Sequence, residues 1–389
     1  MSCARRLSGR ALAEAWRDSR AALLRSVEDL DDAQWRVPRQ EGLNPVAWEL
    51  AHVAWFGEFW VLRGPHRAGD DGLVHAGKPS RIAGPDALLD SARLPHAMRW
   101  DAPLPSRDGV RRMLAAQLEA CLDALPEGDD DAALYFHRLA LFHEDMHAEA
   151  FAWMRATLGH PPPAGATLRH VAPRAPVRLP GGRVRIGWPR ERRGFAFDNE
   201  RDAVEVELAP FEIDAVPVTA GRFLEFVAAG GYADPAWWPG EAGRWRADQA
   251  HPHPARWRRG AAGWEVRWFD RWQPLDPAQP AIHVSAWEAE AYARWAGRRL
   301  PRAAEWEHAA ASGAIDWGTS VWEWTADAFR PYPGFVPGPY RDYSAPWFGD
   351  HRELRGGAFA THARMHEPCY RNFFRPERTD VFAGFRTAC

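Results

Sequence analysis

The sequence predicts a two-domain α+β protein, in which a helical bundle is followed by an irregular domain of short strands and helices. Residues up to about 158 carry apolar side chains at helical spacing, whereas residues 179–389 alternate short β-like runs with Gly, Pro and Trp turns. The segment GHPPPAGATLRHVAPRAP is too rich in Pro and Gly to continue a helix. A chain of 389 residues is also long enough for two cores. We therefore expect domains at 1–158 and 179–389, joined by a linker at 159–178.

Four helical runs make up the first part. The run NPVAWELAHVAWFGEFWVLR begins with Asn44 as the expected N-cap and Pro45 at the first helical position. The others cover residues 9–29, 108–125 and 132–158. This pattern predicts an antiparallel four-helix bundle with a long irregular excursion at 64–107.

The second part predicts an irregular α+β domain. β-like runs stand at GGRVRIGW, AVEVELAPFEI and WEVRWF, and two short helices are expected at 219–229 and 285–297. The many loops between these elements favour a surface that binds ligands.

Charge and composition restrict the classes of partner. The net charge is −3 with acidic and basic residues interspersed, so neither nucleic acid nor a membrane surface is an expected partner. No stretch has the apolar core of a signal peptide or the length of a membrane span. The cysteines, which form no C-x-x-C pair, fit a reducing cytoplasm; they are Cys3, Cys121, Cys369 and Cys389. Small molecules remain as the expected partners, and the oligomeric state stays open.

The stretch LFHEDMHAEAF matches the H-E-x-x-H pattern of zinc metalloproteases. His143 and His147 are four residues apart on a predicted helix, so both imidazoles can reach one metal ion. His52 lies in a helical run of the same bundle and is the best candidate for a third ligand. Three imidazoles suit Fe, Zn, Cu or Ni, so the ligand type alone leaves the metal open.

A zinc hydrolase is one alternative that these residues leave open. It requires Glu144 as general base and a third ligand at a fixed spacing downstream. His160, the next histidine, stands at the wrong spacing and beyond the helix. A non-catalytic ligand-binding protein on the same scaffold is a further alternative.

Longer motifs resemble a known family. NPVAWELAH at 44–52 followed by HEDMH at 143–147 resembles the DinB-like bundle of the ergothioneine-pathway sulfoxide synthases, in which three histidines bind non-haem iron. The second half resembles the formylglycine-generating-enzyme (sulfatase-modifying factor) domain, a C-type-lectin-like fold, over nearly its whole length. The matching segments are GFAFDNE, PVTAGRFLEFVAAGGY, HVSAWEAEAYARWAGRRLPRAAEWEHAA, VWEWTAD, LRGGAFAT and RNFFRPERTDVFAGFRTA.

The resemblance implies an activity. His52, His143 and His147 would bind Fe(II), and Glu144 would lose its role as a protease base. The enzyme would use O₂ to form a carbon–chalcogen bond at the imidazole C2 of hercynine, the trimethylated betaine of histidine. Formylglycine generation is not expected, because its copper site needs a close pair of cysteines and only Cys369 is suitably placed. The quaternary ammonium group of hercynine suits an aromatic cage, and the chain has 22 Trp.

Four departures from the family pattern bear on the second substrate. Met146 stands where the sulfoxide synthases often have Gln, and the segment ASGAIDWGTS is shortened. A Trp-Asp pair found in γ-glutamylcysteine users would lie beyond Cys389. The family's catalytic tyrosine has no clear match before LRGG, so the candidates are His351, which is nearest, and the more distant Tyr340 and Tyr343.

Loss of this acidic clamp for an amino-acid thiol favours a different donor, and the chain resembles in that feature the selenoneine synthases, which join hercynine to a seleno-sugar. The prediction is therefore a C–Se bond-forming enzyme, with a hercynine sulfoxide synthase that uses a thiol donor as the alternative. Seven residues are expected to contact the substrates, namely Met146, Arg81, Trp322, Trp347, Phe373, Phe374 and Arg375. Each of them can instead serve the packing of the fold, as can Arg386.

Overall fold

The computed structural model describes residues 4–389, which divide into two compact units. The helical unit contains the described residues up to Met154 together with Arg193–Ala196 and Pro337–Tyr343. The sheet unit contains Arg155–Arg192, Phe197–Val336 and Ser344–Cys389. The predicted two-part α+β architecture is confirmed, whereas the linker at 159–178 stays a prediction.

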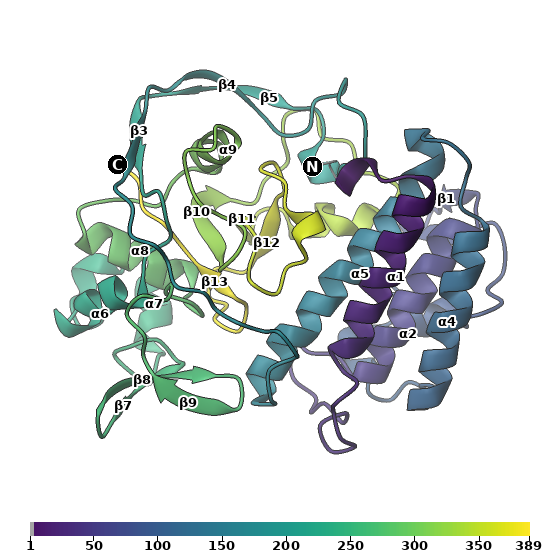
Figure 1. The fold of residues 1–389 in the computed structure, drawn as a ribbon, viewed down its shortest axis with the longest axis horizontal. Coiled ribbons are helices and arrows are strands. Elements are labelled where there is room, and N and C mark those ends of the chain that lie inside the picture. Colours follow the sequence, from purple (N-terminus) through teal and green to yellow (C-terminus); the bar gives the residue numbers. More distant parts are fainter. Residues whose placement is uncertain (1–3) are drawn as a thin grey trace. The chain divides into compact units, whose positions relative to one another are not determined.

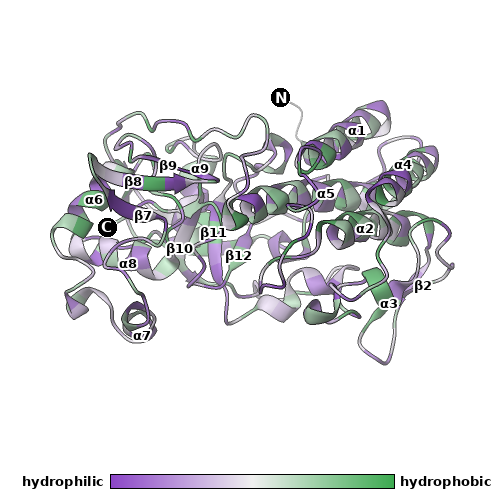
Figure 2. Ribbon diagram, turned by 90° about the horizontal axis from the view of Figure 1, so that it is seen from below, coloured by the Kyte–Doolittle hydropathy of each residue, from purple (hydrophilic) through white to green (hydrophobic). Residues whose placement is uncertain are grey.

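Four long helices lie side by side in the helical unit (Figure 1). They occupy the four runs for which the sequence predicts a helix. The first and third of these helices bury one face, whereas the second is buried on all sides. In α1 the buried residues Leu12, Trp16, Ser19, Arg20 and Leu23 recur every three or four positions and therefore share one face. Figure 2 shows the corresponding alternation of hydrophobic and hydrophilic residues along α1 and α4. The helices are α1 (Gly9–Arg25), α2 (Val46–Gly57), α4 (Arg107–Asp123) and α5 (Asp131–Leu158).

The second helix begins one residue later than predicted. Pro45 is the N-cap residue of α2 and Val46 is its first helical residue, so the prediction of Asn44 as N-cap was wrong. The Asn44 side chain binds Glu49 and Arg99 instead of capping the helix. Every residue of α2 is buried, and the chain continues as a π-helical turn at Glu58–Leu62.

The expectation of a fully antiparallel bundle was also wrong. Arg138, near the start of α5, donates to the carbonyl of Leu7 just before α1, and Glu144 further along α5 binds Arg20 further along α1. The two helices therefore run in the same direction. The long connection between α2 and α4 gives the chain enough length to cross the bundle, which a short loop would not allow.

The connection at 64–107 is largely irregular, as predicted. Strands β1 (His66–Ala68) and β2 (Val74–Ala76) form a short antiparallel pair within it. The four-residue helix α3 (Asp86–Leu89) follows, and the carbonyls of Leu88 and Leu89 at its end contact α2.

The sheet unit is built around a four-stranded sheet with the order β12-β11-β10-β13. β11 pairs antiparallel with both β10 and β12, and β13 runs parallel to β10. The register places Glu323 opposite Arg355 and Leu354 opposite Asn372. The strands are β10 (Trp322–Ala328), β11 (Arg352–Gly356), β12 (Asn372–Phe374) and β13 (Ala383–Gly384).

Shorter antiparallel strands surround this sheet. β4 pairs with β5, β3 with β6, and β7-β8-β9 form a meander. One core cluster lies between β4, β5 and the helix α9 (Ala303–Ala311), where Trp306 is fully buried with Ile186, Leu208 and Ile213. The strands are β3 (Val177–Leu179), β4 (Gly182–Ile186), β5 (Val204–Leu208), β6 (Phe211–Ile213), β7 (Trp257–Gly260), β8 (Gly263–Trp268) and β9 (Arg271–Pro274).

The two predicted short helices are present as α6 (Ala220–Ala228) and α8 (Ala286–Trp295). Each begins at a hydroxyl cap, and in α8 Ser285 and Glu288 form a reciprocal capping box. The prediction missed α7 (Glu241–Ala247) and α9 (Ala303–Ala311). Both are too short for hydrophobic periodicity to reveal them, and α9 is fixed by packing in the core.

Two further observations concern the described part of the chain. No helix among residues 4–389 is long and apolar enough to cross a membrane. Cys121 and Cys369 are buried thiols and Cys389 is an exposed one, whereas Cys3 lies outside the described residues.

Candidate metal centre

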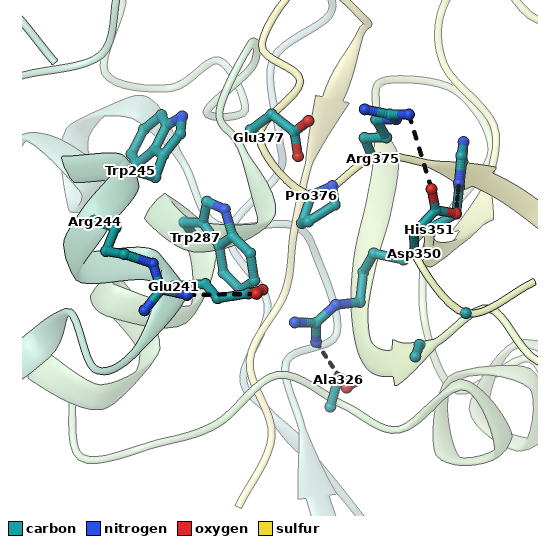
Figure 3. A pocket seen from close by; sticks show the side chains of 13 residues that line it. Glu241, Arg244, Trp245, Trp287, Ala326, Asp350, His351, Arg375, Pro376 and Glu377 are labelled. Carbon is teal, nitrogen blue, oxygen red and sulfur yellow. Dashed lines mark hydrogen bonds and ion pairs between the residues drawn. The ribbon is translucent and has the colours of Figure 1, made fainter. Parts of the chain in front are cut away.

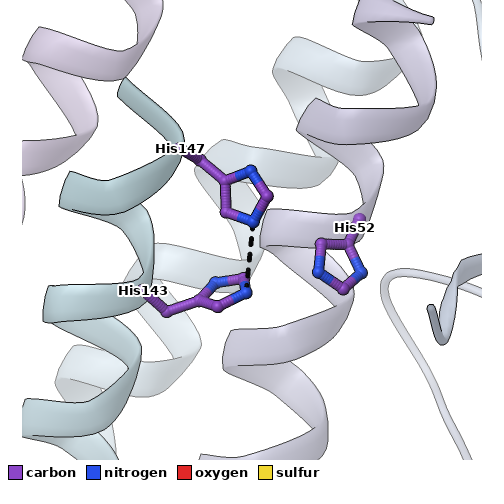
Figure 4. Close-up of side chains that lie close together, drawn as sticks. All are labelled: His52, His143 and His147. Atoms are coloured by element: carbon purple, nitrogen blue, oxygen red, sulfur yellow. Dashed lines mark hydrogen bonds between the residues drawn. The ribbon is translucent and has the colours of Figure 1, made fainter. Parts of the chain in front are cut away.

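Three imidazoles from two helices meet inside the helical unit (Figure 4). α2 supplies His52, and α5 supplies His143 and His147 from consecutive turns. Their ligand atoms all lie within 4.8 Å of one another, and the Nε2 atoms of His143 and His147 are 3.2 Å apart. Two ligands at right angles on an ion, each bonded at about 2.1 Å, are separated by about 3 Å. The cluster therefore has the dimensions of a metal site.

Hydrogen bonds fix the ring orientation of two of these histidines. His52 Nδ1 lies 2.7 Å from the carbonyl oxygen of Leu89, and His147 Nδ1 lies 2.9 Å from Glu49 Oε1. Carbonyl and ionised carboxylate oxygens accept hydrogen bonds, so each Nδ1 carries the proton and donates it. Each Nε2 then keeps its lone pair, which is the arrangement of metal-binding histidines.

Burial keeps the imidazoles of His52 and His143 neutral. Burial lowers the pKa of His52 to about 3, and it holds the pKa of His143 well below the ordinary histidine value. Only the neutral ring can bind a metal. The Nδ1 atom of His143 is buried and has no hydrogen-bond partner among the described residues. A buried group of neutral imidazoles with converging lone pairs fits a divalent transition-metal ion.

Aromatic rings hold the histidines in place. Phe56 lies parallel to His143, with ring centroids 3.6 Å apart and planes inclined by 4°. Trp48 lies parallel to His52 at 5.0 Å and 8°. Both aromatic side chains belong to α2 and are almost completely buried, so the two imidazoles have little freedom to rotate.

Of the candidates for the family's catalytic tyrosine, the structure brings Tyr340 to the cluster. Its segment Pro337–Tyr343 belongs to the helical unit. The Tyr340 ring is edge-on to Phe56 at 5.0 Å and to His143 at 6.4 Å. Burial raises the pKa of the Tyr340 phenol, and the nearby carboxyl groups of Asp342 and Asp90 raise it further. The phenol is therefore protonated at neutral pH and can donate a hydrogen bond.

The other two candidates occupy different positions. The Tyr343 ring lies 6.1 Å from the ring of Tyr340. His351 belongs to the sheet unit, where its Nδ1 is 2.7 Å from Asp350 Oδ1.

The Glu144 side chain contacts α1 and not the histidines of the cluster. Its carboxylate accepts hydrogen bonds from Arg20 Nε at 2.6 Å and from Trp16 Nε1 at 2.9 Å, and it is 1% exposed. A general base must reach the proton of a metal-bound water. Since the Glu144 carboxylate is occupied by a buried arginine, this geometry does not favour the zinc hydrolase.

Two more candidates lie in the helical unit. Met146 is half-buried on α5 beside His147. Arg81 is exposed, and its backbone N–H donates to Glu58 Oε1 at 2.6 Å.

The remaining candidates are in the sheet unit. Trp322 is 2% exposed in β10, which leaves little surface for a ligand. Phe373 stacks on Phe329 with ring centroids 4.2 Å apart, and Arg378 lies over Phe374 at 4.7 Å. Trp347 is exposed and edge-on to His351. Arg386 is fully buried against Glu323 and therefore serves the fold.

A cavity of about 710 Å³ lies within the sheet unit (Figure 3). His351 and Arg375 line one side of it, and the indoles of Trp245 and Trp287 line another. Arg375 is 3.9 Å from Asp350, whose carboxylate also binds His351. The structure thus brings two of the sequence candidates to one cavity.

The residues that support the histidines were not predicted. Glu49 binds His147, and Glu49 is in turn held by Asn44, which binds Arg99. Glu49 stands three residues before His52, a spacing that places both on one helix face. The spacing of Glu49 and His52 could be seen in the stretch WELAH, whereas Arg99 lies in an irregular segment that shows no hydrophobic periodicity.

Comparison with known proteins finds a family model for each part of the chain. The profile of the DinB superfamily matches residues 15–172, and that of the sulfatase-modifying factor enzyme 1-like domain matches 166–320 and 311–389. The formylglycine-generating enzyme of Streptomyces coelicolor is 29% identical, over 58% of this chain and 92% of its own length.

Several hercynine oxygenases match nearly the whole chain. The hercynine oxygenase of Mycobacterium tuberculosis is 33% identical over 420 residues, covering 95% of this chain and 96% of its own length. The hercynine oxygenase of Mycolicibacterium thermoresistibile is also 33% identical, and the match covers 95% of this chain and 93% of its own length. With a DinB-type bundle, a sulfatase-modifying-factor domain and this extent of similarity, the chain belongs to the hercynine oxygenase family, the sulfoxide synthases of the ergothioneine pathway.

Proposed function

We propose that this protein is a non-haem iron enzyme that uses O₂ to join a chalcogen atom to the imidazole C2 of hercynine. The observation that carries the proposal is the buried cluster of His52, His143 and His147 in a chain of the hercynine oxygenase family. These three residues would hold Fe(II) as a facial set. The bound ion would supply O₂ activation, with coordination positions left for the substrates.

Tyr340 is the proposed proton donor. Its phenol is buried next to the cluster and protonated at neutral pH, as the raised pKa requires. Bond formation at C2 releases the C2 proton, whereas the reduction of O₂ takes up protons, so a neutral phenol beside the cluster would serve as general acid for the oxygen that is reduced.

An aromatic cage for the trimethylammonium group of hercynine stays a proposal. The Trp60 and Phe56 rings lie 6.0 Å and 5.0 Å from the Tyr340 ring, but they are only 3% and 1% exposed. Because Phe56 also stacks on His143, neither ring presents a free face to a cation.

We propose a seleno-sugar as the donor, which makes the product a C–Se compound. The support comes from the sequence: Met146, a soft thioether, stands where the sulfoxide synthases often have Gln, and the segment ASGAIDWGTS is shortened. Exposed Trp347 and the cationic side chains of Arg81 and Arg375 stay proposals for donor contacts. A thiol donor, which gives a C–S bond, is the alternative that the hercynine oxygenase relatives favour.

The test is anaerobic reconstitution with Fe(II), followed by hercynine, O₂ and one donor at a time. The donors are a 1-seleno sugar, cysteine and γ-glutamylcysteine, and mass spectrometry reads the products. We expect an O₂-dependent product with the selenium isotope pattern from the seleno-sugar and slower turnover of the thiols. Faster turnover of a thiol overturns the selenium assignment, and no O₂-dependent product from any donor overturns the proposed function.

A further inference from the structure

A chain of hydrogen bonds connects Arg99 to one histidine of the cluster. Arg99 NH1 donates to Asn44 Oδ1 at 2.7 Å, and Asn44 Nδ2 donates to Glu49 Oε2 at 3.1 Å. The other carboxylate oxygen, Glu49 Oε1, accepts from His147 Nδ1 at 2.9 Å. Each donor therefore meets an acceptor along the whole chain, from the guanidinium to the imidazole.

A second contact leads from Arg99 to another histidine of the cluster. The Arg99 guanidinium lies over the Trp48 ring, 4.0 Å from its centroid. Trp48 in turn lies parallel to His52, and its Nε1 donates to the Leu88 carbonyl next to the Leu89 carbonyl that binds His52. One arginine thus supports two of the three imidazoles without contacting either.

The orientation of Asn44 depends on Arg99. An amide side chain can rotate by half a turn and exchange its acceptor with its donor. Because Arg99 offers only donors, it binds the amide oxygen and directs the amide N–H groups toward Glu49. A Glu49 carboxylate held in this orientation accepts the hydrogen bond of His147 Nδ1 and leaves the Nε2 atom of that imidazole free.

We propose that Arg99 is a positioning residue for the trihistidine site, acting through Asn44 and Glu49 on His147 and through Trp48 on His52. Metal affinity then depends on a side chain from the irregular segment between α3 and α4, remote in sequence from all three histidines. The inference rests on the proposed function only in that a divalent metal binds the cluster.

The test uses the full-length protein freed of metal and titrated with Co²⁺, whose visible spectrum reports coordination geometry. Loss of a hydrogen-bonding residue behind a metal-binding histidine weakens affinity by about ten- to a hundred-fold. We expect about ten-fold weaker Co²⁺ binding in Arg99→Met and in Asn44→Ala, each with an altered spectrum. Arg99→Lys, which keeps the charge over Trp48, recovers part of the affinity.

A double-mutant cycle separates positioning from general destabilisation. If Arg99 acts through Asn44, Arg99→Met weakens Co²⁺ binding by only about two-fold in the Asn44→Ala background, because the effects of coupled residues do not add. Arg93→Met is the matched control, since Arg93 lies in the same segment and pairs with Asp90. It should lower the thermal stability without changing Co²⁺ affinity or spectrum.

The possible outcomes distinguish a failure of the positioning role of Arg99 from a failure of the proposed function. Wild-type affinity and spectrum in Arg99→Met, equal changes in Arg93→Met, or additive effects in the cycle overturn the role of Arg99 and leave the proposed function standing. If wild-type protein binds neither Co²⁺ nor Fe²⁺ at the cluster, both are overturned. Should Asn44→Ala fail to fold, Glu49→Gln replaces it, with the buried Glu58→Gln as its control, because Glu58 accepts from Ser80 and from backbone N–H groups.

Discussion

Glu144 and Arg20 form a buried ion pair between α5 and α1, with Arg20 Nε and NH2 2.6 Å and 3.0 Å from the two carboxylate oxygens. Arg20 also donates to Gln117 and to the Leu114 carbonyl of α4. The pair therefore joins three helices of the bundle. The glutamate of the H-E-x-x-H stretch serves the fold at this position, while the histidines on either side of it form the cluster.

Replacing Glu144 tests this role. Glu144→Gln leaves the Arg20 guanidinium buried without its counter-charge, and we expect a loss of about 3–5 kcal/mol in the free energy of unfolding. Urea denaturation measures it. Glu14→Gln, which breaks the exposed pair with Arg10, should cause no measurable change. Retention of full stability in Glu144→Gln, with loss of activity alone, would instead favour a general-base role.

The three histidines are expected to act as one metal site. In His52→Ala the ion loses a ligand that cannot be replaced from α5, so we expect the bound metal per chain to fall close to zero after desalting. Elemental analysis measures it, and circular dichroism checks that the bundle is retained. His96→Ala is the control, because His96 binds the Leu43 carbonyl and lies outside the cluster. Equal metal content in both variants would contradict the assignment.

Tyr340→Phe removes the phenol while keeping the ring that packs on Phe56. If the phenol is the general acid, the rate of product formation should fall by about a hundred-fold or more. The comparison is with Tyr343→Phe, which we expect to stay within a few-fold of wild type. Metal content should be unchanged in both. If Tyr340→Phe is fully active, the Tyr340 phenol is not the general acid, and His351 becomes the candidate for that role.

The pKa of Tyr340 also predicts a dependence of stability on alkaline pH. The folded state raises this pKa above its unfolded value of about 10, so above that pH the unfolded state releases a phenol proton that the folded state keeps. Stability is therefore lost as the pH rises past the ordinary tyrosine value. Urea titrations at pH 8 and 10.5 should show a smaller decline for Tyr340→Phe than for wild type. An identical decline in the two proteins would contradict the raised pKa.

Cysteine reactivity follows burial. Burial raises the pKa of the Cys121 thiol to about 12, so almost no thiolate forms near neutral pH, whereas Cys389 is exposed. In a Cys3→Ser background, iodoacetamide at pH 8 should modify Cys389 rapidly and Cys121 only after unfolding. Peptide mass spectrometry reads the two sites. Modification of both at similar rates in the folded protein would show that the α2–α4 contact opens readily.

The four long helices and the three histidines that lie together in the cluster were predictable from the sequence. Helical periodicity over 12 or more residues is a strong local signal, and an i,i+4 histidine pair specifies its own geometry. The family followed from long ordered motifs in both halves. In the sheet unit, α7 and α9 were missed because a helix of two turns has too few apolar positions to show a period.

The contacts of residues whose partners are distant in the chain became visible in the folded protein alone. Glu144 and Glu49 are both helical glutamates near a histidine, yet one binds Arg20 and the other binds His147. Tyr340 reaches the cluster because its segment packs on α2, and Arg99 reaches Asn44 across an irregular connection. Such contacts arise from the packing of segments far apart in sequence, and neither local propensity nor periodicity encodes them.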